Sequence, residues 1–390
     1  MVRIRLVQFS VSVGVAGLLC LPVSTAAQTP APVLSPLSAA ALRAVLSSAV
    51  SASQDPAPAA QAMPAGGGRV FNPDMSVIAN FLGIAGKNPV NTSPALSLSE
   101  VEVAMQAIVD PYAKADFYLS AGPDGMNIEE GFITFTALPA DFQMKVGKLH
   151  AQFGKVNTMH THALPYADRP LVNMNLVGGE EGLTDSGISV SKLIPAGGLF
   201  LEATGEVYAG TSAVFTSPQR SKLNYVGRLR TYRDITEGSN IDIGASAAFG
   251  PTAVGPESNL TLYGIDATFR YRPLRRAIYH RFQARTELVW SRQDAAVTTA
   301  LPQKAFGWYG LMEYQFGRLW YIGGRADRSG RALDATLTDS GMSAFLTYWP
   351  SEFSQIRGQF RRTRYAEGVT GNEVLFQLNF SIGAHGAHVF

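Results

Sequence analysis

The most constraining feature of this sequence is a long series of segments in which polar and apolar residues alternate. One runs from Val374 to Ile382 and another from Asn240 to Ala247. Alternation with a period of two is the signature of a β-strand, because successive side chains point to opposite faces. Such segments recur from about residue 72 onward with turn residues between them, so the chain is expected to be all-β.

The alternation predicts sixteen strands, and the connections between them alternate in length. Tight connections such as Asp110-Pro111 and Thr236–Ser239 are separated by mostly longer ones such as 151–183. An even strand count with short turns on one rim and long loops on the other is typical of a transmembrane antiparallel up-and-down β-barrel. The predicted strands cover residues 74–84, 98–109, 112–121, 126–138, 141–150, 184–194, 199–209, 222–234, 240–250, 258–272, 278–292, 304–316, 318–328, 339–349, 352–366 and 372–384.

One face of these strands is apolar and aromatic. Phe282, Leu288 and Trp290 share a face, and Trp308 and Trp320 fall towards strand ends, where barrels carry aromatic girdles at the lipid interface. We therefore expect this face to meet outer-membrane lipid and the other face to line a lumen. A soluble core is the alternative reading of the same residues.

The N-terminus has the layout of an export signal. Arg3 and Arg5 precede the apolar run Val11–Val23, and small residues follow in Ser24–Ala27. This pattern predicts a signal peptide over 1–27, cleaved after Ala27, and a bacterial outer-membrane location. Residues 28–71 are rich in Ala, Pro and Ser and are expected to form a leader or linker, so the barrel would occupy 72–390.

The charge balance excludes one class of partner. The chain has 32 Lys and Arg against 30 Asp and Glu, and removal of Arg3 and Arg5 leaves 30 of each sign. A neutral chain lacks the basic excess that drives binding to nucleic acid, so no nucleic-acid partner is expected. Cys20 is the single cysteine and lies in the predicted signal, so disulfides and thiolate metal sites are not expected either.

The inward face is predicted to carry an arginine wall. Rings of charge set the ion preference of pores, so these side chains are candidate pore-lining residues of a channel for small polar or ionic solutes. Acidic residues such as Glu100, Glu102 and Glu206 dominate the inward face of the first seven strands. The candidate arginines are Arg228, Arg230, Arg281, Arg285, Arg325, Arg357 and Arg361, with Arg270 on the same wall.

Residues 151–183 form the longest connection of the predicted barrel. A long loop in a compact protein is usually functional, and this one could fold inward as a constriction loop. Its candidate residues are Asp168, Arg169, Glu180 and Glu181, and we expect the three acids to face the arginine wall.

A resemblance to a known family rests on this region. Gly147-Lys148, Phe153-Gly154, Leu164–Leu171 with its Asp168-Arg169 pair, and Gly187–Val190 are together similar to the corresponding stretch of the phosphate-selective-porin-like (porin O/P) superfamily. The resemblance covers about forty-five residues. It implies a sixteen-stranded porin with a constriction loop in this place, and a homotrimer.

Histidines give the only hint of a metal. His160 and His162 lie in the long loop near His150, but we expect solvated loop histidines, no metal site and no cofactor. An enzyme is not expected, because His280, the one histidine well within a strand, shares the lipid face of Phe282 and cannot serve as an oriented base. The alternatives to an open channel are a metal-linked uptake receptor and a plugged structural barrel.

Overall fold

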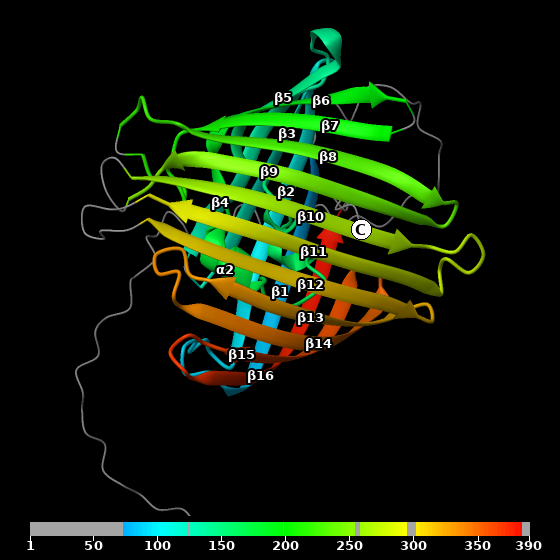
Figure 1. Cartoon of the computed structure of the whole chain (residues 1–390). Coiled ribbons are helices and arrows are strands. Elements are labelled where there is room, and N and C mark those ends of the chain that lie inside the picture. Colours follow the sequence, from blue (N-terminus) through cyan, green and yellow to red (C-terminus); the bar gives the residue numbers. More distant parts are fainter. Residues whose placement is uncertain are drawn as a thin grey trace, which may run out of the picture. The chain divides into compact units, whose positions relative to one another are not determined.

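A computed structural model describes residues 73–123, 125–197, 199–217, 219–253, 258–294 and 302–383. The predicted signal peptide 1–27 and leader 28–71 lie outside the described residues. The described part forms a closed barrel of sixteen strands in which each strand pairs antiparallel with its chain neighbours and β1 pairs with β16 (Figure 1). The predicted fold is therefore confirmed.

The strand bounds agree with the predicted ranges to within a few residues. The strands are β1 (Asp74–Lys87), β2 (Leu96–Asp110), β3 (Ala113–Gly122), β4 (Gly125–Phe135), β5 (Phe142–His150), β6 (Thr184–Ala196), β7 (Leu199–Tyr208), β8 (Asn224–Thr236), β9 (Ser239–Pro251), β10 (Asn259–Tyr271), β11 (His280–Gln293), β12 (Gln303–Phe316), β13 (Trp320–Gly330), β14 (Thr338–Ser351), β15 (Ser354–Arg364) and β16 (Thr370–Gly383).

The two faces of the sheet differ as the alternation predicts. Trp290, Phe306 and Phe376 are exposed on the outside, whereas inward residues such as Asp266 and Gln377 are buried. Apolar groups outside and polar groups inside are the arrangement of a barrel in lipid rather than of a soluble one. Among the described residues, no helix is long and apolar enough to cross a bilayer.

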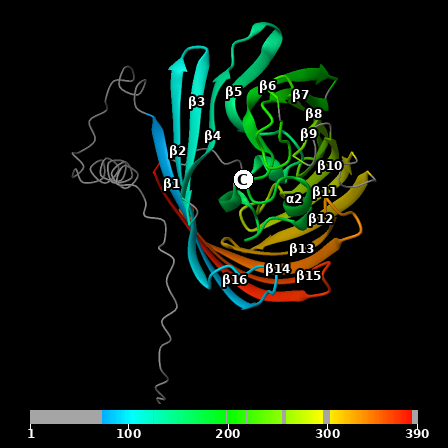
Figure 2. The same cartoon turned by 90° about the vertical axis from the view of Figure 1, so that its left-hand side faces the viewer.

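The connection between β5 and β6, here called the lumenal segment (151–183), lies within the ring of strands (Figure 2). It contains the short helices η2 (Val156–Thr158), η3 (Thr161–Ala163) and α2 (Leu171–Leu176). α2 begins after Pro170, whose fixed φ suits the start of a helix. The segment fills the middle of the barrel.

Apolar packing holds the lumenal segment against the wall. Val156 and Val172 are fully buried, and they belong to one cluster with wall residues such as Val289 and Leu311. Burial of one such side chain contributes about 1.5–3 kcal/mol. The interior is therefore a packed core crossed by polar contacts, and the segment has a fixed position in it.

Candidate functional site

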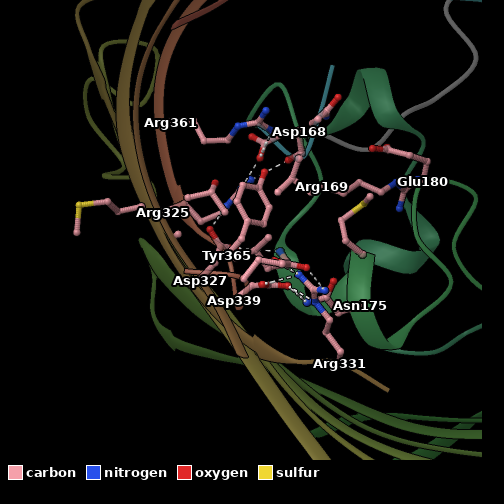
Figure 3. Close-up of a pocket in the computed structure, with 18 residues that line it drawn as sticks. Asp168, Arg169, Asn175, Glu180, Arg325, Asp327, Arg331, Asp339, Arg361 and Tyr365 are labelled. Carbon is pink, nitrogen blue, oxygen red and sulfur yellow. Dashed lines mark hydrogen bonds and ion pairs between the residues drawn. The ribbon is translucent and has the colours of Figure 1, made fainter. Parts of the chain in front are cut away.

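Asp168 ties the lumenal segment to β13 and β15. Its Oδ2 accepts from Arg325 Nη2 at 2.8 Å and from Arg361 Nη1 at 3.1 Å, and its carbonyl accepts from Arg325 Nη1 at 2.7 Å. Gln359 donates to Oδ1 and accepts from the backbone N–H of Ala167. Asp168, Arg325 and Arg361 lie side by side in Figure 3. Two arginines and the Gln359 amide thus bind one carboxylate of the lumenal segment.

The environment of Asp168 shifts its titration. Burial raises the pKa of this carboxyl, but the charges of Arg325 and Arg361 outweigh burial and hold the pKa at about 2. A carboxyl whose pKa is lower in the folded protein than in the unfolded chain stabilises the fold at pH values above its unfolded pKa. That contribution is lost as the pH falls through its folded pKa. The ion pairs of Asp168 with Arg325 and Arg361 are therefore expected to be intact at neutral pH and to weaken only in strong acid.

We expect the lumenal segment to stay docked at pH 4 and to loosen as the pH approaches 2. Protection of the segment from pepsin in the folded, detergent-bound protein measures this. The Asp168→Asn variant is the control, because it has no carboxyl to titrate and should show no pH step in this range. Loss of protection in the wild type well above pH 4 would contradict the assignment.

Glu287 on β11 holds the start of the lumenal segment. Its Oε1 accepts from the backbone N–H groups of Lys155 at 2.9 Å and Val156 at 2.6 Å, and from Tyr309 Oη at 3.2 Å. Gly154 has a φ of +64°, and a Cβ there would lie 2.7 Å from Glu287 Oε2. Only glycine therefore fits both the backbone conformation and the close approach.

α2 is fixed to the same wall by two further carboxylates. The backbone N–H of Leu171 donates to Asp327 Oδ1 at 3.3 Å, at the first residue of the helix. Asn175 Nδ2 donates to Asp339 Oδ2 at 2.9 Å. The segment is thereby bound to β11, β13, β14 and β15. In the strand order of the closed barrel, these strands lie across from β5.

The cavities around the lumenal segment in the described part of the chain include three of about 270 Å³ or more. The long-loop cavity, of about 300 Å³, includes Asn91, Arg331 and Glu367 in connections at the long-loop rim. The short-turn cavity, of about 870 Å³, includes Arg318 and Phe353 at the opposite rim. The side cavity, of about 270 Å³, lies between the segment and β4 to β8. Open space thus reaches the segment from both rims.

All seven predicted pore-lining arginines are on inward positions, but they fall into two groups. Arg228, Arg230, Arg325 and Arg361 form ion pairs with carboxylates. Among the described residues, no carboxylate lies within ion-pair distance of the other three. These are Arg281, Arg285 and Arg357, which line the short-turn cavity.

The predicted residues of the constriction loop also divide. Asp168, Arg169 and Glu180 line the long-loop cavity together with Arg325 and Arg361 (Figure 3). Glu181 does not face the arginine wall, so that expectation is wrong. Its side chain is exposed and lines none of the three cavities, because the glycine turn at 178–182 directs the chain back towards β6.

The prediction of solvated loop histidines is also wrong. The side chains of His160 and His162 are each only 6% exposed, and they lie beside His150 inside the barrel. No sequence signal indicates this burial, because it arises only when the loop folds into the lumen and carries its polar residues inward. Glu129 and Glu130 on β4 join this cluster and were missed as site residues, since the parity of β4 is unclear in the sequence.

Sequence comparison gives one relative that covers most of the chain. It is described as an uncharacterized protein of Aquifex aeolicus, and it is 30% identical over 83% of this chain and 81% of its own length. No family model matches the chain.

Comparison with solved structures gives outer-membrane channels. An anion-selective porin from Comamonas acidovorans superposes with a TM-score of 0.55 and 10% identity, covering 80% of this chain and 99% of the porin. The channel DcaP of Acinetobacter baumannii superposes with a TM-score of 0.54 and 11% identity, covering 80% of this chain and 96% of DcaP. A trimer form of OmpT of Vibrio cholerae superposes with a TM-score of 0.53 and 9% identity, covering 80% of this chain and 99% of OmpT. At these identities the likeness concerns the fold, which is that of a porin-like barrel.

Proposed function

We propose that this chain, which belongs to the same family as the Aquifex aeolicus protein, is an outer-membrane channel through which small polar solutes diffuse passively. The observation that carries the proposal is the barrel itself: a closed ring with an apolar exterior, a charged interior and cavities that reach its central segment from both rims. Channels with this fold conduct through the lumen, and an inward loop sets the width of the path.

The charge of the short-turn cavity favours anions. Six arginines and two glutamates line it. Arg357 donates to the neutral oxygens of Thr347 and Gln377, so its charge is not cancelled there. Positive charge that is not cancelled raises the local concentration of anions and repels cations. We therefore propose that small anions are the preferred solutes, a preference that the name of the Comamonas porin states for that protein.

The experiment is single-channel recording of the refolded protein in a planar bilayer with a KCl gradient across it. We expect stepwise openings and a reversal potential of the sign that chloride selectivity produces. A correctly folded barrel that never conducts would remove the channel proposal and favour a plugged structural barrel. Conduction with cation selectivity would retain the channel and overturn the anion preference.

We expect Arg281→Gln to lower the ratio of anion to cation permeability by about two- to threefold. A unit charge about 7 Å from a permeating ion in water contributes about 0.6 kcal/mol, which is the size of such a change. The reversal potential in a salt gradient measures the ratio. The matched control is Arg362→Gln, which removes an exposed arginine outside the cavities and should leave the ratio unchanged. Equal shifts in both variants would contradict the role of the cavity.

Two finer points extend the proposal. The residues that resemble the porin O/P superfamily include Gly154 and Asp168, which make anchoring contacts with Arg228 and Arg325. This supports assignment of the chain to that superfamily. A homotrimer is supported by the trimer form of OmpT, which has the same fold.

A further inference from the structure

A cluster of histidine and glutamate side chains lies inside the barrel, away from the arginine wall. Glu102 is fully buried, and the side chains of His150 and Glu129 are 3% and 10% exposed. These groups come from β2, β4, β5 and the lumenal segment. The members of this His/Glu cluster are Glu100, Glu102, Glu129, Glu130, His150, His160 and His162.

A β-bulge explains why β4 contributes two adjacent acids. Tyr118 on β3 pairs with Glu130, but the next residue, Leu119, pairs with Ile128, so Glu129 is an extra residue on β4. A bulge breaks the alternation and re-aims side chains. Glu129 and Glu130 therefore both point inward, which a regular strand would not allow. The segment then brings His160 and His162 over this pair.

The spacing of the cluster fits the ligands of one metal ion. One ligand atom from each of Glu129, His150 and His160 lies within 4.8 Å of the other two. Oε1 of Glu129 is 3.5 Å from His150 Nε2 and 3.2 Å from His160 Nδ1. Bonds of about 2.0–2.1 Å in a tetrahedral zinc site place neighbouring ligand atoms about 3.3 Å apart. Oε2 of Glu102 lies 2.9 Å from His160 Nδ1, and Glu102 forms with Glu100 and His162 an adjacent group whose ligand atoms also lie within 4.8 Å of one another.

The hydrogen bonds of His150 leave its Nε2 as an acceptor. Thr184 directs its hydroxyl proton to the carbonyl of Glu181 at 2.9 Å, so its oxygen accepts from His150 Nδ1 at 2.7 Å. With the ring proton on Nδ1, Nε2 presents its lone pair, and this buried atom lies 3.5 Å from Oε1 of Glu129. Two acceptors that face each other repel, and a cation between them removes the repulsion.

Glu130 arranges the second histidine in the same way. Its Oε2 lies 3.1 Å from His160 Nε2, and its Oε1 accepts from the backbone N–H of His150 at 2.7 Å. A carboxylate that accepts from one ring nitrogen directs the other nitrogen of that ring to a metal, which is the usual second shell of zinc sites. In His160 this other nitrogen is Nδ1, which faces Glu102 and Glu129.

Carboxylate oxygens in the cluster also need a partner. Oε1 of Glu102 and Oε2 of Glu129 are buried and accept no hydrogen bond. Buried polar atoms without partners are rare in folded proteins, and a bound ion is one way in which such atoms are satisfied. Four carboxylates face three imidazoles here, so a divalent cation would also reduce the excess negative charge.

We propose that Glu102, Glu129, His150 and His160 bind one divalent transition-metal cation, with zinc as its representative. Thr184 and Glu130 orient the two imidazoles, and Glu100 and His162 border the site. The nitrogen and oxygen ligands suit zinc and its neighbours rather than calcium or magnesium, which prefer oxygen alone. The ion would join β2, β4 and β5 to the lumenal segment, and this does not depend on whether the barrel conducts.

Calorimetric titration of the metal-free, refolded protein with zinc tests the proposal. We expect one ion per chain, and a loss of affinity of at least about 100-fold in His150→Gln. Thr184→Val, which removes only the group that orients His150, should lose about 10- to 100-fold. His280→Gln is the matched control, because that histidine lies at the outer face against Tyr314, and it should bind like the wild type.

Two outcomes would overturn the site. One is a folded wild type that takes up no stoichiometric zinc, and the other is His150→Gln that binds as tightly as the wild type. X-ray absorption at the zinc edge of the loaded wild type removes any dependence on variants that fold poorly. It should show two imidazoles and two oxygen ligands, and a shell without histidine would place the ion elsewhere.

Discussion

Replacement of Asp168 by alanine is expected to release the middle of the lumenal segment and to raise the single-channel conductance several-fold. The variant leaves Arg325, whose side chain is 2% exposed, with Asp327 as its remaining carboxylate, and Arg361 with Glu373. Breaking a buried ion pair from one side costs about 3–5 kcal/mol, because the remaining charge stays buried. Undocking of the segment relieves that cost, and an undocked segment no longer narrows the lumen.

Conductance and proteolysis together measure this release. Trypsin should cut the variant within the segment, after Lys155, faster than the wild type. Asp334→Ala is the matched control, because Asp334 lies in a rim connection and its hydrogen bonds are to Thr336 of the same turn. If Asp168→Ala kept both the wild-type conductance and the resistance to trypsin, the ion pairs would not be what holds the segment.

The second large effect is expected for Glu287→Ala, which should lower the free energy of unfolding by about 3 kcal/mol or more. The change removes the acceptor for the backbone N–H groups of Lys155 and Val156. Each buried donor that loses its acceptor costs about 1–3 kcal/mol, and the truncation adds a cavity beside Gly154. Urea titration of the refolded barrel, followed by tryptophan fluorescence, measures the loss.

Two comparisons make this result specific. Glu287→Gln retains an oxygen acceptor and should lose less than half as much stability as the alanine variant. Glu237→Ala, in an exposed turn between β8 and β9, should change stability by no more than about 0.5 kcal/mol. Equal losses in the alanine and glutamine variants would show that the charge of Glu287, rather than its two backbone contacts, is what matters.

The barrel was predictable because a closed sheet in lipid imposes one rule on every strand. Trp290 and Phe306 must face lipid and Gln377 must face the lumen, so polar and apolar residues alternate along each strand. Turn residues mark the ends of each alternating segment. All sixteen strands follow from that rule, since it depends on neighbouring residues alone.

The candidate site was less predictable, because it depends on contacts between residues far apart in the chain. Asp168 pairs with Arg325 and Arg361, whereas Glu181 turns away from them after a glycine turn that the alternation does not describe. The buried cluster of His/Glu residues depends on a bulge at Glu129, which shifts the parity of β4 by one residue. A rule of strict alternation cannot locate such a shift.

The position of the anchors sets an order on biogenesis. The lumenal segment is translated before β11, β13 and β15, yet Glu287, Arg325 and Gln359 on those strands are the groups that bind it. Contacts between residues so distant in sequence form late in folding. The ring of strands therefore has to be nearly complete before the segment can make these contacts. We expect a newly inserted barrel to pass through a stage with a wider lumen, which ends when β11, β13 and β15 provide the groups that bind the segment.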